Sequence, residues 1–172
     1  MQGPTVRILP VRPEDIPDLV RLAREIWHRH YPGIITAEQI EYMLARGYSP
    51  EVIEAQLVSG KAWWDKLLLD GQLVAFGSCE RGSSADELKI DKLYVRYDLR
   101  GRGYGSLLIE HARRRALDLG CKRLILQVNK NNTSAIEAYK KNGFAVVESA
   151  VFEIGGGFVM DDYVMARDVG CG

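Results

Sequence analysis

The feature that most constrains the fold of this 172-residue chain is a glycine-rich segment between an apolar run and an amphipathic stretch. Its sequence, Val95-Arg96-Tyr97-Asp98-Leu99-Arg100-Gly101-Arg102-Gly103-Tyr104-Gly105-Ser106, has glycine at alternate positions with arginine between them. Glycine lets the backbone turn its N–H groups inward, and a helix start adds unpaired N–H donors and a positive partial charge. The segment therefore predicts a strand, an anion-binding loop and a helix, suited to a phosphate or pyrophosphate.

The glycine spacing disfavours two common nucleotide motifs. The dinucleotide fingerprint G-x-G-x-x-G would need glycine at Ser106, and no Lys-Ser or Lys-Thr follows as in a P-loop. A dinucleotide-dependent oxidoreductase is therefore a distant alternative. An RNA-binding arginine–glycine tail is also disfavoured, because the repeat is short and lies between a strand and a helix. A flexible loop that merely precedes a helix remains an alternative.

Composition narrows the function further. The 23 basic and 23 acidic residues cancel, so bulk charge favours neither a nucleic-acid nor a membrane-surface partner. The three cysteines are widely spaced and fit neither a disulfide framework nor a zinc motif, so we expect reduced thiols, no metal and a cytoplasmic location. The chain has no apolar signal core near Met1 and no long apolar span, and its length favours one domain over residues 1–172.

Periodicity and turn residues predict alternating strands and helices. Helices are expected from Pro13 to a stop at Tyr31-Pro32-Gly33, and over 36–44, 50–60, 103–119 and 134–141. Strands are expected over 5–9, 62–69, 72–80, 86–95, 123–128, 144–154 and 158–167. This order predicts an α/β (α+β) fold in which helices cover the faces of a mixed sheet.

With these elements in place, the chain resembles the GNAT superfamily of acyl-CoA N-acyltransferases. Arg100, Gly103 and Gly105 match its pyrophosphate loop, Q/R-x-x-G-x-G/A. The second signature, V-x-x-x-N-x-x-A-x-x-x-Y-x-x-x-G-F, is matched by Val128, Asn132, Ala135, Tyr139, Gly143 and Phe144. The resemblance implies a single domain with a mixed, mostly antiparallel central sheet and helices on both faces.

The resemblance also implies acetyl-CoA, or a related acyl-CoA, as the acyl donor. The pyrophosphate would be held by backbone N–H groups of Arg100, Gly101, Arg102, Gly103, Tyr104, Gly105 and Ser106. The strand residues Leu93, Tyr94 and Val95 would pair with the pantetheine arm, and an N–H group there would polarise the thioester carbonyl. Asn132 would bond the same arm, with helix N-capping as its structural alternative.

The implied chemistry is attack of a primary amine on the thioester. Tyr139 matches the usual general acid, which protonates the departing thiolate, although this side chain could instead be a packing residue. Asp91 is the candidate base and Glu87 a second option, while a water-relayed base is a comparable alternative. A solvated Asp91 paired with Lys89 or Lys92 is the structural alternative.

The expected acceptor is a small amine. The segment 35–60 contains one basic residue, Arg46, and four acidic residues, Glu38, Glu41, Glu51 and Glu54. This excess of negative charge suits a cation. The ending 161–166 weakly resembles bacterial polyamine or diamine acetyltransferases. Acetylation of a protein N-terminus or lysine is the alternative, and a non-catalytic acyl-CoA-binding sensor is an alternative of another class. We expect no nucleic-acid or membrane partner, and a homodimer is left open.

Overall fold

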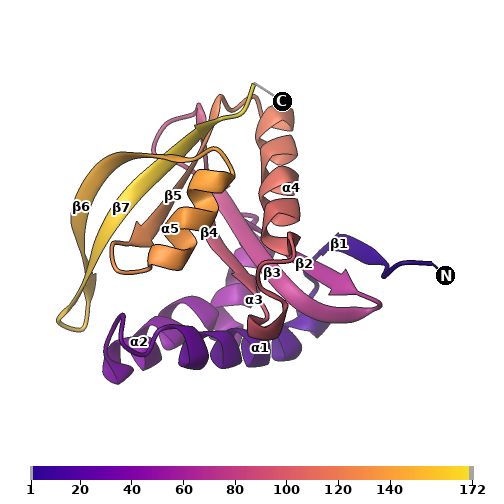
Figure 1. The fold of residues 1–172 in the computed structure, drawn as a ribbon. Coiled ribbons are helices and arrows are strands. Elements are labelled where there is room, and N and C mark those ends of the chain that lie inside the picture. The colour runs from indigo at the N-terminus through magenta and orange to yellow at the C-terminus, as the bar shows by residue number, and fades with distance from the viewer. Residues whose placement is uncertain (1, 171–172) are drawn as a thin grey trace. The chain divides into compact units, whose positions relative to one another are not determined.

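The structure, a computed structural model, describes residues 2–170, so Cys171 lies outside the described residues (Figure 1). The strands are β1 (Val6–Pro10), β2 (Ala62–Leu69), β3 (Gln72–Arg81), β4 (Glu87–Val95), β5 (Arg123–Asn129), β6 (Ala145–Gly155) and β7 (Phe158–Asp168). The α-helices are α1 (Ile16–His30), α2 (Ala37–Tyr48), α3 (Pro50–Ser59), α4 (Tyr104–Asp118) and α5 (Thr133–Lys141). Two 3-10 turns complete the list. η1 (Pro13–Asp15) precedes α1, and η2 (Tyr97–Leu99) precedes residues 100–106, here called the glycine-rich loop.

The strands form a seven-stranded sheet in the order β1-β2-β3-β4-β5-β7-β6. Antiparallel ladders join β1 to β2, β2 to β3, β5 to β7 and β7 to β6, while β4 and β5 pair in parallel. The predicted α/β class with a mixed, mostly antiparallel sheet is therefore confirmed. The described residues fall into two compact units: the chain up to Glu80 with Lys92–Leu108, and Arg81–Asp91 with the chain from Ile109 onward. The prediction of one domain stays a prediction.

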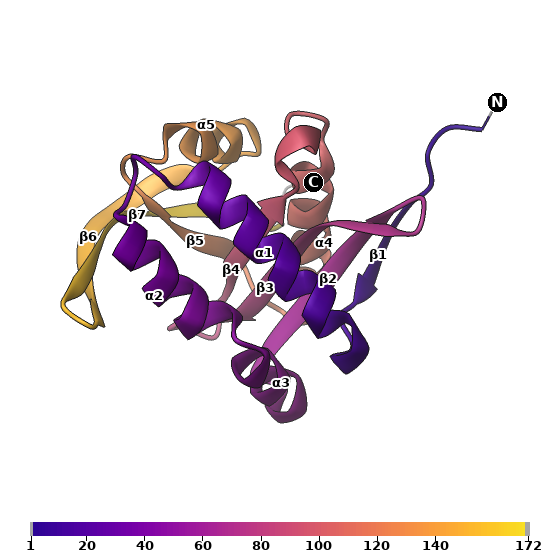
Figure 2. The same cartoon turned by 90° about the horizontal axis from the view of Figure 1, so that it is seen from below.

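In the first unit, α1, α2 and α3 pack on one face of β2 and β3. Figure 2 shows α1 lying across these strands with α2 beside it. The local signals are strong, because the hydroxyl oxygens of Thr36 and Ser49 accept N–H bonds that cap α2 and α3, and Gly60 ends α3 with a φ of 68°. Trp64 and Phe76 supply the strand side of this core.

A second core lies on the other face of the same strands. Leu67 is an odd number of residues from Trp64, so its side chain points the opposite way. It packs with Ala75 and with Leu99 and Leu108, which flank the glycine-rich loop. Burial of these apolar side chains on both faces fixes where that loop begins and ends.

In the second unit, the first half of β4 pairs with β5, which pairs with β7, and β7 with β6. Alternate residues of these strands are buried, including Leu88, Leu124, Leu126 and Met165. Strands β6 and β7 form a long hairpin (Figure 1). The buried thiols Cys79, in the first unit, and Cys121, in the second, are not joined in a disulfide. No helix within residues 2–170 has the length and apolar content to cross a membrane.

Candidate active site

The glycine-rich loop has the backbone conformation that its sequence predicts. Gly101 and Gly103 have φ values of 76° and 90°, a region that residues with a Cβ rarely adopt. The Gly103 carbonyl accepts the Leu107 N–H at 3.1 Å, so helical bonding starts directly after this glycine. The first N–H groups of α4, those of Tyr104, Gly105 and Ser106, precede the first intrahelical donor and are available to an anion.

Both ends of the loop are fixed by the first unit. The Arg96 N–H donates to the Val74 carbonyl at 2.7 Å, which extends the sheet bonding one residue beyond β4. Leu99 is only 6% exposed and packs with Leu108. A Cβ on Gly105 would lie 3.8 Å from Val95, which is ordinary contact, so this position has room for alanine. The loop is therefore pre-organised, which limits the entropy lost on binding.

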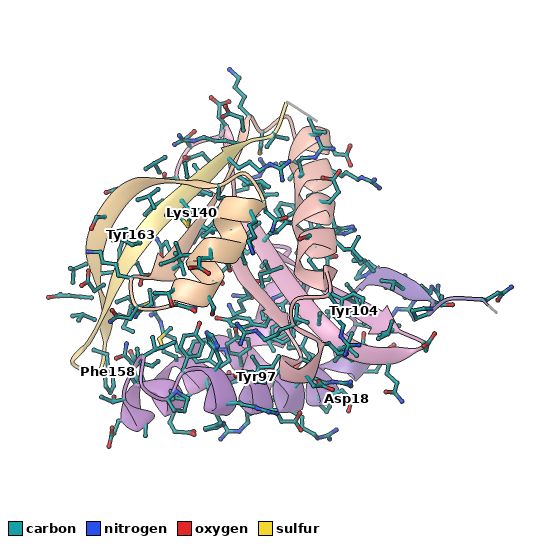
Figure 3. The ribbon with its side chains drawn as sticks, viewed as in Figure 1. Asp18, Tyr97, Tyr104, Lys140, Phe158 and Tyr163 are labelled. Carbon is teal, nitrogen blue, oxygen red and sulfur yellow. The ribbon has the colours of Figure 1, made fainter. Side chains whose placement is uncertain are left out.

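Arginines lie around the loop, and Tyr97 and His30 contact two of them, Arg29 and Arg100. The Tyr97 ring has the guanidinium carbons of Arg29 and Arg100 at 4.2 and 5.1 Å from its centroid. Arg100 Nη1 lies 3.2 Å from His30 Nδ1, which links the loop to the end of α1. Figure 3 labels Tyr97 beside α1 and Tyr104 at the start of α4. The positive charge of Arg100 and of the exposed Arg102 adds to that of the helix start.

The end of β4, which leads into the loop, packs against a hydrophobic core on each of its faces. Tyr94 packs against the aromatic core of α1–α3, and its hydroxyl is 3.0 Å from that of Tyr31. Leu93 and Val95 point into the second core with Leu108. All the predicted pyrophosphate and pantetheine positions from Leu93 to Ser106 are thus in the first unit.

Asn132 and Tyr139 belong to the second unit, on the segment that follows β5. Asn132 is 5% exposed and occupies the N-cap position of α5, but its side chain makes no capping hydrogen bond. The structural alternative for its side chain is therefore not supported. Tyr139 is half-buried on α5, with its ring 5.9 Å from that of the buried Phe144 in an edge-on arrangement. Packing and the proposed acid role are both compatible with this placement.

The two candidate bases on β4 differ in environment. Asp91 has a side chain that is 30% exposed, with an oxygen 3.8 Å from Lys89 Nζ. This is the ion pair that the sequence offered as an alternative. Glu87 is buried and bonded to Arg123 at 2.5 Å and to Ser83 at 3.3 Å. These bonds hold the Glu87 carboxylate against Arg123 on β5.

A third carboxylate, Asp162 on β7, has no functional role predicted from the sequence. It is 0% exposed, and neither carboxylate oxygen has a hydrogen-bond partner among the described residues. Burial, followed by the charge of Asp161, raises its pKa from 3.8 to about 6, although Lys89 and Lys130 act in the opposite direction. The available signal was the pair Asp161-Asp162 between the apolar stretches 158–160 and 163–166, where alternation directs one of the two inward.

The acidic segment of α2 and α3 is less available than its sequence suggested. Glu41 is bonded to His28 Nε2 at 2.6 Å and to Arg24 at 3.3 Å, both on α1. The hydrogen bond from His28 leads the effects that lower the pKa of Glu41. His28 is exposed, and its hydrogen bond to Glu41 joins α1 to α2. Glu38, Glu51 and Glu54 are exposed. No cluster of residues suited to a metal occurs within residues 2–170.

Comparisons with known proteins agree with the loop and the fold. The model of the acetyltransferase (GNAT) family matches residues 20–144. The spermidine N(1)-acetyltransferase of Thermoplasma acidophilum is 28% identical over 152 residues, covering 86% of this chain and 91% of that protein. A peptidyl-lysine N-acetyltransferase of Salmonella typhimurium, YjaB, is 42% identical over 67 residues, 38% of this chain and 43% of that protein.

A solved structure has the same fold over almost the whole chain. The PaiA N-acetyltransferase of Thermoplasma acidophilum, in complex with coenzyme A, aligns with a TM-score of 0.81. The alignment covers 95% of this chain and 99% of that one, at 23% sequence identity. The family match spans both signature segments, from the strand before the loop to Phe144. The chain therefore belongs to the GNAT family of acetyltransferases.

Proposed function

We propose that this protein transfers an acetyl group from acetyl-CoA to a primary amine of a small cationic acceptor, a diamine or polyamine. The observation that carries the donor is the loop at the start of α4, where Gly101 and Gly103 have positive φ and the first helical N–H groups are available. The relative named as a spermidine acetyltransferase, which aligns over most of both chains, supports the acceptor class.

The donor loop and the end of β4 lie in the first unit. Backbone N–H groups from Arg100 to Ser106 bind the pyrophosphate, while the exposed Arg102 adds charge. Leu93, Tyr94 and Val95 present strand edges to the pantetheine arm, and one N–H group polarises the thioester carbonyl. Asn132 bonds the same arm, in keeping with a buried side chain that does not cap its helix.

The acceptor amine must be neutral before it can attack the thioester. An alkyl ammonium has a pKa near 10.4, so its deprotonation at neutral pH costs roughly 4–5 kcal/mol. The amine nitrogen attacks the thioester carbon, and its proton passes to Asp91, directly or through water. As the carbon–sulfur bond breaks, the Tyr139 hydroxyl donates a proton to the departing thiolate. The products are the acetylated amine and coenzyme A.

The experiment that tests this function is a coenzyme A release assay across a panel of amines. We expect turnover of spermidine and of 1,4-diaminobutane. Aminoglycosides, free lysine and peptides with free N-termini or lysines complete the panel. Preferred turnover of a peptide would replace the small-amine acceptor by a protein, which the local similarity to the peptidyl-lysine acetyltransferase makes the second candidate. Binding of acetyl-CoA without turnover of any amine would favour a non-catalytic sensor.

A further inference from the structure

The buried carboxyl of Asp162 is not accounted for by the roles assigned above. Its two oxygens have no hydrogen-bond partner within residues 2–170, and its side chain is inaccessible to solvent. Burial of an unpaired carboxylate costs several kcal/mol, so such groups are rare outside binding and catalytic sites. The described residues make no hydrogen bond to this carboxylate that would offset the cost.

The strand register places Asp162 where a ligand is expected. Asp162 lies directly opposite Asn129, the last residue of β5, and opposite the uncharged Ala150 on β6. β5 is parallel to β4, so Asp162 lies at the carboxyl end of one strand of the parallel pair. The segment that follows Asn129 contains Asn132 and leads to Tyr139, both proposed site residues.

The same register assigns Asp162 to one face of the second unit's sheet. Directly opposite residues share a face, as do alternate residues of one strand. Lys89 pairs with Ile125, and Asn129, four residues further along β5, pairs with Asp162. Asp162 therefore shares a face with Lys89, and also with Asp91, two residues after Lys89 on β4.

The nearby cations are directed to other carboxylates. Lys130 Nζ bonds Asp161 at 2.6 Å, and Lys89 Nζ lies 3.8 Å from Asp91. Figure 3 labels Tyr163, the neighbour of Asp162 on β7, whose ring has Lys130 Nζ 5.6 Å from its centroid. Neither lysine makes a hydrogen bond to Asp162, whose oxygens have no hydrogen-bond partner among the described residues.

We propose that Asp162 binds the ammonium group of the acceptor that does not react, and so selects diamines and polyamines over monoamines. The proposal rests on the proposed function, since it needs an amine acceptor. In a diamine, one nitrogen must lose its proton to attack the thioester, while the other keeps its charge. The retained ammonium supplies a hydrogen-bond partner for this carboxylate, and a monoamine of equal length cannot. Asp162 is therefore a specificity-determining residue, distinct from the base Asp91.

The test compares two substrates that differ by one ammonium, 1,4-diaminobutane and n-butylamine. In Asp162→Asn, we expect kcat/KM for the diamine to fall roughly 10- to 100-fold, with most of the change in KM, because a buried charge partner is lost. The value for n-butylamine should change less than about twofold, since it never used this carboxylate. Asp161→Asn is the matched control: its carboxylate is exposed and already paired, so both substrates should be little affected.

A second measurement needs no variant. In the unchanged protein, the ratio of kcat/KM for the diamine to that for n-butylamine should fall as the pH drops through about 6, where Asp162 takes up a proton. Protonation of the reacting amine is similar in both substrates, so its effect on the rate cancels in this ratio. Asp161, Lys89 and Lys130 are the charged groups that act on Asp162.

The failures are distinguishable. If the unchanged protein acetylates diamines but Asp162→Asn loses both substrates equally, or neither, the selectivity role is wrong and the proposed function stands. A diamine-to-monoamine ratio that is flat between about pH 5 and 8 overturns the role as well. If the unchanged protein neither binds 1,4-diaminobutane in calorimetry nor acetylates it, the small-diamine acceptor fails together with the role of Asp162.

Discussion

The unpaired carboxyl of Asp162 should lower the stability of the folded protein in a pH-dependent way. A carboxyl whose pKa is higher in the folded state than in the unfolded state destabilises the fold once both states are ionised. Below 3.8 both states are protonated and the penalty vanishes. It grows as pH rises and is complete above the folded pKa of about 6. At about 1.36 kcal/mol per pH unit, the full penalty is about 3 kcal/mol, and about half of it has developed by pH 5.

The assay is urea unfolding of the unchanged protein and of Asp162→Asn, followed by far-ultraviolet circular dichroism at several pH values. The asparagine amide does not ionise in this pH range. Any cost of burying the amide is the same at every pH, so it cancels when the change in unfolding free energy with pH is compared between the two proteins. Between about pH 5 and pH 7.5, the free energy of unfolding of the variant should rise by about 1.4 kcal/mol relative to the unchanged protein.

The control is Asp161→Asn, which keeps the Asp162 carboxyl. Because Asp161 contributes to the raised pKa of Asp162, this change should reduce the pH dependence without abolishing it. A constant difference in unfolding free energy between the unchanged protein and Asp162→Asn across this pH range would refute the reasoning. It would mean that the carboxyl is solvated or bonded in the folded state, and the inferred ammonium site would lose its basis.

Three further predictions concern the donor loop, the proposed acid and the first unit. Gly103→Ala should cost about 1–2 kcal/mol of stability because of its positive φ and should weaken acetyl-CoA binding in calorimetry, whereas Gly105→Ala, which has room for a Cβ, should do neither. Tyr139→Phe should lower kcat about 10²- to 10⁴-fold with little change in acetyl-CoA affinity; full activity would reduce Tyr139 to a packing residue. Burial opposes ionisation of Asp15, but the hydrogen bond from Lys66 helps to hold its pKa below 3.8. Lys66→Met should therefore lower the free energy of unfolding by about 1 kcal/mol near neutral pH, and by less as the pH falls below 3.8. An equal loss of stability in strong acid would contradict this.

Sequence predicted the elements that depend on local signals. The hairpin of β2 and β3 turns at Asp70-Gly71, and both residues have the positive φ that such a turn requires. The glycine-rich loop was predictable for the same reason. The structure extends α2 to Tyr48, one turn beyond the predicted end at Leu44. The helix continues since Tyr48 is buried in the core of α1–α3, so tertiary packing outweighs local propensity there.

Features set by distant pairing were beyond sequence reasoning. Nothing near Glu41 in the chain reveals that His28 and Arg24 occupy its carboxylate, since this depends on how α1 packs against α2. The buried state of Asp162 likewise follows from its pairing with Asn129 on one side and Ala150 on the other. The register shift between Val146 and Glu148 on β6 also has no local signal. Charge patterns in sequence thus identified acidic segments but not which carboxylates are available.

The strand order of the second unit constrains when this part of the chain can fold during synthesis. β7 follows all the other strands in sequence, yet it lies between β5 and β6 and pairs with both. Until Phe158–Asp168 has left the ribosome, β5 and β6 have no ladder to each other, and the apolar residues of β5 lack part of their cover. The nascent chain must therefore keep two strand edges unpaired for as long as β6 and the turn after it are being translated. Such edges are prone to mispairing with other chains, so chaperone dependence should be greatest at this stage of synthesis.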